Sequence, residues 1–235
     1  MKLYYKDEYI KLFQGDCLEV MDKLIEKGIK ADCIITDPPY KTTPRGRGKS
    51  TTTGGILNNK IFNSGKPFNI VQIEDYIDKL YAILKDTGHC YIMTNNKNLT
   101  HFLNIIDKSN FNYVKVLIWD KVSPLPNQFY MDRHEYIILL RKGKAVKVNN
   151  NSIPSILNIK TVNKNGVNYE KHLTEKPVDL MKILISQSSQ EDELIFDPFL
   201  GNGSTAIASK ELKRKCIGIE LEEKYCEIAK NRLTV

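Results

Sequence analysis

The chain has no long apolar run and few of the side chains that bind metals or form disulfides. No hydrophobic stretch approaches the ~20 residues that cross a membrane, and the segment Met1–Asp7 contains no apolar signal core. The five cysteines show no CxxC spacing and the four histidines are scattered. This distribution argues against a zinc site or a disulfide framework and for a reducing compartment. We therefore expect a cytoplasmic protein with no metal and no membrane partner.

What the chain does have is positive charge and enough length for a core. Its 235 residues carry 35 Lys and Arg against 28 Asp and Glu, a net charge of +7. A basic balance favours a polyanionic partner such as nucleic acid, although a merely soluble basic protein fits the composition equally well. Hydrophobic residues make up 41% of the chain, which suits one domain. We expect residues 1–235 to form that domain, with the polar stretch 141–171 as a short variable insert.

Short apolar runs alternate with amphipathic patterns along the chain. Strands are expected at 9–13, 33–36, 90–93, 114–119, 135–140, 193–196 and 216–219, and helices at 18–27, 73–84, 98–108, 176–188, 204–212 and 222–232. This alternation predicts a mostly parallel α/β sheet, in which ligands bind beyond the carboxyl ends of the strands. Asp16, Asp37, Asp197 and Glu220 all stand at or just after such ends, so we expect the functional site there.

The sequence Asp37-Pro38-Pro39-Tyr40 closes the apolar run 33–36. Proline has no backbone N–H, so this turn presents carbonyl oxygens beside a carboxylate that, when ionised, only accepts hydrogen bonds. The Asp37 carboxylate and the Pro38 carbonyl could hold both hydrogens of a base amino group and free its lone pair. Tyr40 could stack on the base. The alternative is a tight turn between a strand and a loop.

A second pattern runs from Phe196 to Thr205 and reads as strand, glycine loop and helix. Gly201 and Gly203 would let a ligand approach the backbone, and the helix N-terminus favours a carboxylate. The third glycine of the dinucleotide fingerprint is absent. Glu220, one strand–helix–strand step downstream, could accept hydrogen bonds from ribose hydroxyls. Together these features indicate an adenosine-containing cofactor, although a plain strand–helix turn and helix caps explain each feature separately.

These motifs together resemble the DNA amino-methyltransferases that use S-adenosylmethionine, over most of the chain. The resemblance assigns the catalytic motif to Asp37–Tyr40, the Phe-x-Gly-x-Gly cofactor motif to Phe199–Gly203 and a Thr-x-Lys-Pro element to Thr174–Pro177. The catalytic motif precedes the cofactor motif, a permuted order that is similar to the β class of this family. The resemblance therefore implies a Rossmann-like methyltransferase sheet, mostly parallel and seven-stranded with one antiparallel strand, and a possible homodimer.

Three groups of site residues follow from the motifs and the resemblance. The expected catalytic residues are Asp37, Pro38, Pro39 and Tyr40. The expected cofactor-binding residues are Asp16, Cys17, Thr36, Asp37, Thr174, Lys176, Asp197, Pro198, Phe199, Gly201, Gly203, Ser204, Thr205, Glu220 and Leu221. The expected DNA-binding residues are Lys41, Arg45, Arg47 and Lys49 after the catalytic motif and Arg141, Lys142 and Lys144 in the insert, where Asn149 could read an adenine edge. In this scheme Lys176 helps hold the methionine end of the cofactor and Asp16 contacts its adenine. Helix termini are the alternative explanation for both, and a solvated surface is the alternative for the basic residues.

The expected function is methyl transfer from S-adenosylmethionine to the N6 amino group of an adenine flipped out of double-stranded DNA. Asp rather than Ser at position 37 favours adenine, but cytosine-N4 presents a similar amine and stays open. RNA or protein-glutamine methylation, for which Asn-Pro-Pro is usual, and a silent DNA-binding protein are further alternatives. No Pro-Cys pair is present, which argues against methylation of a base-ring carbon. Trp119–Lys121 and Arg133–Tyr136 resemble weaker elements of the family, but core packing explains Trp119 and Tyr136 equally well.

Overall fold

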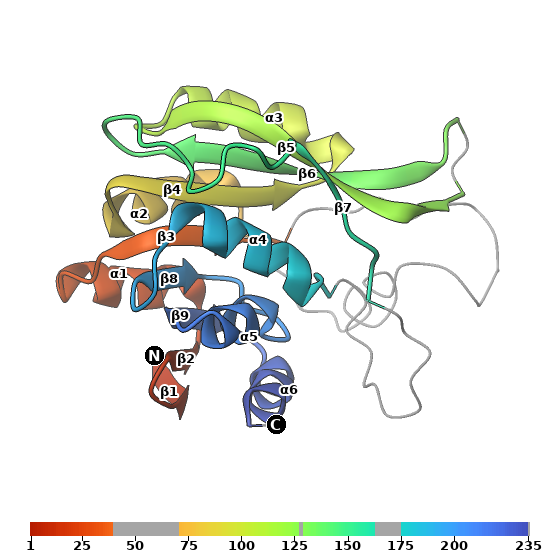
Figure 1. Cartoon of the computed structure of the whole chain (residues 1–235). Coiled ribbons are helices and arrows are strands. Elements are labelled where there is room, and N and C mark those ends of the chain that lie inside the picture. Colours follow the sequence, from red (N-terminus) through yellow and green to blue (C-terminus); the bar gives the residue numbers. More distant parts are fainter. Residues whose placement is uncertain (40–70, 127–128, 163–174, 235) are drawn as a thin grey trace, which may run out of the picture.

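The computed structural model describes residues 1–39, 71–126, 129–162 and 175–234, and Figure 1 shows their arrangement. Over these residues nine strands form one sheet, ordered β1-β2-β9-β8-β3-β4-β6-β5-β7. The strands are β1 (Lys2–Lys6), β2 (Ile10–Gln14), β3 (Ala31–Thr36), β4 (Leu84–Thr94), β5 (Asn112–Leu125), β6 (Asp132–Arg141), β7 (Ile156–Asn158), β8 (Leu194–Asp197) and β9 (Lys215–Glu220). The helices are α1 (Cys17–Glu26), α2 (Ile73–Ile83), α3 (Asn96–Asp107), α4 (Val178–Ser188), α5 (Ser204–Glu211) and α6 (Glu223–Leu233).

The sheet confirms the expected methyltransferase-like α/β fold. Strands β2, β9, β8, β3 and β4 pair in parallel, and β6 lies antiparallel between β4 and β5. Seven strands therefore form the expected core with β6 reversed, as far as the structure describes it. Strand β1 adds antiparallel to β2, and β7 adds parallel to β5. Neither edge strand was predicted, because β1 is largely exposed and β7 buries only its central leucine.

Side chains of the central strands alternate between two apolar layers. Ile34 and Cys90 pack with α1, α2 and α3 on one face of the sheet. Cys33, Ile35 and Tyr91 pack with α4, α5 and α6 on the other face. A strand covered on both faces reads as a continuous apolar run, which explains why these segments could be located from the sequence. All five cysteines lie in the described residues, where they are buried and form no disulfide.

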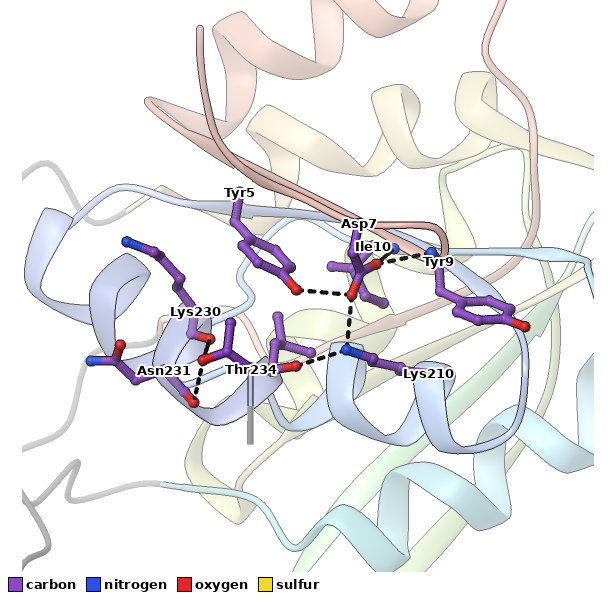
Figure 2. Close-up of polar contacts among 9 residues, drawn as sticks. Tyr5, Asp7, Tyr9, Ile10, Lys210, Lys230, Asn231 and Thr234 are labelled. Atoms are coloured by element: carbon purple, nitrogen blue, oxygen red, sulfur yellow. Dashed lines mark hydrogen bonds and ion pairs between the residues drawn. The ribbon is translucent and has the colours of Figure 1, made fainter.

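The turn between β1 and β2 is tied to the two C-terminal helices by polar contacts (Figure 2). One oxygen of Asp7 accepts a hydrogen bond from the backbone N–H of Tyr9 at 2.9 Å. The other accepts from the Tyr5 hydroxyl at 2.9 Å and pairs with Lys210 Nζ, also at 2.9 Å. Lys210 in turn donates to the carbonyl oxygen of Leu233 at 2.7 Å. These contacts fix the sheet edge at the amino end of β2, opposite the edge where the site lies.

The insert begins at the amino ends of the central strands and returns along the outer edge of β5. Asn149 donates from its amide to the carbonyl oxygens of Ser186 and Ser189 at the end of α4, at 2.7 and 3.0 Å. Strand β7 then pairs with β5, and Trp119 donates its indole N–H to the carbonyl oxygen of Ile159 at 2.8 Å. The described part of the insert is therefore packed against the domain. No helix in the described residues is long and apolar enough to cross a membrane.

Candidate active site at the carboxyl edge of the sheet

The direction in which the chain leaves two neighbouring strands defines the site. From β3 the chain reaches β4 by way of α2 on one face, whereas from β8 it reaches β9 by way of α5 on the other face. The crevice between β3 and β8 is therefore a topological switch point, where open α/β sheets bind ligands. Asp37 follows β3 and Asp197 ends β8, so two carboxylates flank this crevice.

Two acids hold the glycine loop after β8: Asp197 at the start of the loop and Glu220 at the end of the neighbouring strand β9. Asp197 accepts from the backbone N–H of Phe199 at 3.0 Å and from the Thr205 hydroxyl at 2.6 Å, across the loop. Glu220 accepts from the backbone N–H of Gly201 at 2.9 Å. Gly201 and Gly203 have φ of 55° and 85°, which glycine adopts without strain. The acids thus fix the loop conformation, and each carboxylate oxygen keeps a lone pair for a ligand.

Close packing against β9 leaves no room for a side chain behind this loop. A Cβ on Gly218 would lie 2.5 Å from Leu200 Cδ2, and one on Gly203 would lie 3.0 Å from Ala229 Cβ. The Leu200 N–H also donates to the carbonyl oxygen of Ile219 at 2.8 Å. The glycine at position 218, two residues before the expected ribose acceptor, therefore lets the Leu200 side chain pack directly on β9, and a Cβ there would force Leu200 to move.

Burial and neighbouring acids raise the pKa of Asp197 to about 7. Its side chain is buried, and the charges of Asp37 and Glu220 further oppose its ionisation. Burial also raises the pKa of Glu220, although it accepts from the backbone N–H groups of Glu222 and Gly201. A concentration of carboxylates at one edge favours a ligand that brings hydrogen-bond donors or positive charge.

Asp37 is the end of a chain of four charged side chains that are buried or largely buried. Lys176, just before α4, bonds to Asp37 Oδ2, and its ammonium also lies 3.4 Å from Glu135 Oε2 on β6. Lys121 of β5 bonds to the other oxygen of Glu135. The Lys121 ammonium stands 5.3 Å from the centre of the Trp119 ring, a cation–π contact. Two acids and two lysines thus alternate, so the buried cluster is neutral as a whole.

The charges in this cluster set the ionisation of its acids. Burial raises the pKa of Asp37; Lys176 opposes this effect and the negative charge of Glu135 adds to it. Burial also opposes ionisation of Glu135, but Lys176 and Lys121 outweigh it and hold its pKa below the ordinary range. Lys176 is therefore the group that keeps Asp37 in its acceptor form inside the crevice.

A guanidinium joins the segment around Lys176 to the glycine loop. Arg232 of α6 donates to the carbonyl oxygen of Asn202 at 2.8 Å and lies 2.8 Å from the carboxylate of Glu175. Asn202 belongs to the glycine loop and Glu175 precedes Lys176 in the chain. One side chain therefore sets the position of both segments.

Several buried oxygens at this edge have no hydrogen-bond partner among the described residues. They are Asp37 Oδ1, Thr36 Oγ1, Thr94 Oγ1, Tyr76 OH and Asn202 Oδ1. Unsatisfied buried polar atoms are costly, so a cluster of them indicates a place for a polar ligand. Asp37 Oδ1 and Asn202 Oδ1 are acceptors and fit a ligand with amino groups. The described residues contain no group of His, Cys, Asp and Glu arranged to hold a metal ion.

The structure brings most of the expected cofactor-binding residues to this edge. Thr36, Pro38, Pro198, Ser204 and Thr205 are buried there, and Leu221 is half exposed. The Phe199 ring packs edge-on against Tyr76 with centroids 5.4 Å apart. Asp16 is the N-cap of α1 and accepts from the N–H groups of Leu18 and Glu19, at 2.8 and 3.2 Å, through one oxygen. Burial raises the pKa of the adjacent Cys17 thiol to about 12, so Cys17 is no nucleophile.

The expected DNA-binding residues fall into two groups. Arg141, Lys142 and Lys144 lie at the amino edge, where Arg141 pairs with His89 near the beginning of the paired part of β4. That position is roughly 16 Å along the strand from Thr94, at about 3.3 Å per residue. Lys142 donates to the carbonyl oxygens of Tyr81 and Leu84 at 3.0 and 2.9 Å. This placement gives Lys142 and the packed Asn149 structural roles and supports no contact with DNA at the site. Tyr40, Lys41, Arg45, Arg47, Lys49 and Thr174 lie outside the described residues.

A surface hollow of about 450 Å³ lies beside the contacts of Figure 2 and includes Tyr5, Asp7 and Lys210 in its lining. The polar groups of these three residues bond to one another or to the backbone. The hollow is at the amino end of β2, far from Asp37 along the strands, and we do not regard it as the active site.

Sequence reasoning missed four residues that the fold brings to the site. Glu135 and Lys121 come from the neighbouring strands β6 and β5, and Arg232 and Asn202 come from α6 and the glycine loop. The sequence signals were the weak similarity of 119–121 and 133–136 to family elements and, for Asn202, its place inside the cofactor motif. Lys121 lies two residues beyond Trp119, which is the residue opposite Glu135, so its pairing with Glu135 becomes recognisable only when the register Trp119↔Glu135 is known.

Comparison with known proteins identifies the family. The profile of the N6 and N4 DNA methylases matches residues 31–231, so the chain belongs to this DNA methylase family. The chain is 29% identical to the Type II methyltransferase M2.MboI of Moraxella bovis, over 99% of its own length and 91% of that protein. It is 28% identical to the Type II methyltransferase M.HinfI of Haemophilus influenzae, over 99% of its length and 70% of that protein.

Two solved structures share the fold. M1.HpyAVI, solved in complex with S-adenosylmethionine, superposes with a TM-score of 0.73 at 24% identity and covers 96% of this chain and 100% of its own. The cytosine-N4-specific PvuII DNA methyltransferase superposes with a TM-score of 0.74 at 17% identity, covering 98% of this chain and 88% of its own. The same sheet therefore occurs in an enzyme whose target is a cytosine amino group.

Proposed function

We propose that this protein transfers the methyl group of S-adenosylmethionine to the N6 amino group of an adenine flipped out of double-stranded DNA. The observation that carries the proposal is the buried Asp37 carboxylate. Lys176 occupies one of its oxygens, and the other has no partner among the described residues. The site thus presents one charged, unsatisfied acceptor beside the carbonyl of Pro38, which is the arrangement that an amino group with two hydrogens fits.

Asp37 acts on the target nitrogen through hydrogen bonding. Its free Oδ1 accepts one amino hydrogen and the Pro38 carbonyl accepts the other, so the nitrogen lone pair is directed out of the base plane. The nitrogen becomes positively charged as it forms its bond to carbon, and a nearby carboxylate stabilises that charge. Burial raises the pKa of Asp37, which also makes it a better acceptor for the proton that the methylated nitrogen releases. Tyr40, three residues after Asp37, is proposed to stack on the flipped base.

The glycine loop, Glu220 and the segment around Lys176 are proposed to hold the cofactor. Bound S-adenosylmethionine supplies a methyl carbon that is activated by its positive sulfur. Glu220 has lone pairs left for ribose hydroxyls, and Asp16 has one carboxylate oxygen outside its helix cap for the adenine. The unsatisfied acceptor of Asn202 fits the amino group of the methionine part. The positive charge of Lys176 can attract the methionine carboxylate, since opposite charges at close range stabilise each other.

The choice of adenine over cytosine rests on Asp37. The fold does not distinguish the two bases, since the PvuII enzyme that shares it is cytosine-N4-specific. Asp in this position is common among adenine enzymes of the family, whereas cytosine enzymes more often carry Ser. Membership of the DNA methylase family favours DNA over RNA or protein as the substrate.

The deciding experiment is the identification of the methylated base. Plasmid DNA is incubated with the protein and isotopically labelled S-adenosylmethionine, digested to nucleosides and analysed by mass spectrometry. We expect label in N6-methyladenine; label in N4-methylcytosine selects the alternative base, and transfer to RNA but not to DNA contradicts the proposal. The variant Asp37→Ala is expected to lose transfer by at least a hundredfold, about 2.7 kcal/mol or more of transition-state stabilisation, and to keep its affinity for the cofactor in calorimetry. Asp22→Ala, which removes a surface acid of α1, is the matched control.

A further inference from the structure

The β5–β6 ribbon extends beyond the rest of the sheet. Strand β6 pairs with β4 only as far as Tyr136, which faces the last β4 residue, Thr94. Residues 132–135 and the facing part of β5 continue past that point. At about 3.3 Å per residue the paired ribbon reaches roughly 13 Å past the end of β4. Figure 1 shows this ribbon leaving the body of the sheet. It leaves from the carboxyl edge, the edge that carries Asp37, so it projects to the side from which a DNA substrate must approach.

A strained bulge sets the direction of this ribbon. The register shifts between Asp120 and Leu125, and within the shift Val122 has φ of 66°, which is rare for a β-branched residue. Asp120 accepts from the Val122 N–H at 2.7 Å and from Arg133 Nε at 2.6 Å, which ties the bulge to the opposite strand. Bulges bend a strand and are common next to active sites. The orientation of the ribbon is therefore built into the fold.

The tip of the ribbon is apolar and exposed. Phe129, Tyr130 and Met131 are 85%, 88% and 59% exposed, and Leu125 at the end of β5 is half exposed. Consecutive large apolar side chains in water are unusual unless they meet a partner. Four of the charges below the tip form pairs, because Arg133 bonds to Asp120 and Lys121 bonds to Glu135. Phe129, Tyr130 and Met131 therefore offer two rings and a thioether, and the charged residue that follows them is Asp132.

We propose that Phe129, Tyr130 and Met131 insert between base pairs of duplex DNA beside the target base. Apolar wedges of this composition unstack neighbouring bases, and the major groove of DNA admits a two-stranded ribbon. Insertion next to the target lowers the cost of flipping that base, and the rings replace the stacking that is lost. The inference rests on the proposed function in its choice of duplex DNA, but not in its choice of adenine.

The ribbon fits DNA better than a second copy of the chain. A second copy that added a strand to the exposed part of β5 would need backbone donors there, but Pro124 has no N–H and Pro126 follows it with none. The ribbon carries Lys121 of β5 and Glu135 of β6 at its base, and these residues join the tip to the charge cluster of Asp37. A wedge that acts beside the target base has to be connected to the reacting centre in this way.

The test compares two tip variants with a matched control. Phe129→Ser combined with Tyr130→Ser removes both rings, and Tyr130→Trp keeps a stacking ring. Tyr113→Ser removes an exposed tyrosine from the amino-edge end of the same β5 strand. The substrate is a 30-base-pair duplex, first shown to be methylated by the wild-type protein, with 2-aminopurine beside the target base. Its fluorescence rises when that base unstacks.

The expected result is at least a tenfold weaker affinity of the double variant for the duplex, since a ring stacked on a base contributes about that factor or more. The fluorescence rise should be lost in the double variant and kept in Tyr130→Trp and Tyr113→Ser. Cofactor affinity and the dependence of DNA affinity on salt should not change, because no phosphate contact is removed. Unchanged DNA affinity, a smaller salt dependence, or conversion of a dimer to a monomer in sedimentation would each overturn the wedge. Failure of the wild-type protein to methylate any duplex would overturn the proposed function instead.

Discussion

The stability of the protein should depend on pH through one buried acid. Asp197 has its pKa raised from 3.8 to about 7 by burial and by the nearby charges of Asp37 and Glu220. The folded protein therefore holds this proton more tightly than the unfolded chain does. The contribution of Asp197 to the free energy of unfolding is therefore fully present below pH 3.8, and it is lost progressively as the pH rises through about 7. A pKa difference of this size corresponds to about 4 kcal/mol.

The variant Asp197→Asn removes this loss and preserves the local hydrogen bonds. The amide oxygen can still accept from the Phe199 N–H, and the Thr205 hydroxyl can rotate to accept from the amide nitrogen. We expect the variant to match the wild type within about 1 kcal/mol near pH 4. At pH 8 it should be more stable by up to about 4 kcal/mol.

Urea unfolding followed between pH 4 and 8 measures this difference, provided that the slope against urea is the same for both proteins. The exposed Asp78→Asn in α2 is the matched control, for which no pH-dependent gain is expected. A stability difference between Asp197→Asn and the wild type that stays constant over this pH range, or that falls at high pH, would refute the reasoning.

Three further predictions concern the site. Gly218→Ala should destabilise the fold by about 1–3 kcal/mol and weaken cofactor binding, because Leu200 must move to make room. Thermal unfolding measures the stability and calorimetry measures the cofactor affinity; wild-type values in both would contradict the prediction. In the pH profile of kcat at saturating cofactor, Lys176→Gln should move the acidic limb to higher pH, since Lys176 lowers the pKa of Asp37, the proposed catalytic carboxylate. Glu135→Gln should move the same limb to lower pH, since its charge raises that pKa, and shifts in the same direction for both variants would disprove the assignment. Arg232→Gln should weaken cofactor binding roughly tenfold at nearly unchanged affinity for DNA, because a charged hydrogen-bond partner of the loop is lost; equal losses for both ligands would argue against it.

The sequence alone was sufficient to locate the buried strands and the residues that follow them at the ligand edge. A buried parallel strand reads as an apolar run, and the residues that end it stand at the ligand edge in any such sheet. Asp37, Asp197 and Glu220 could therefore be assigned to one edge without coordinates. The order of the motifs also indicated the family to which the chain belongs.

Only the tertiary structure could decide which distant residues join that edge. Glu135 reaches Lys176 because β6 runs antiparallel beside β4, and the same reversal carries Arg141 and Lys142 to the opposite edge. Strand direction is set by long-range pairing, and no local pattern reports it. The charge of a segment predicted the kind of partner, whereas the direction of a strand determined which charges can reach the site.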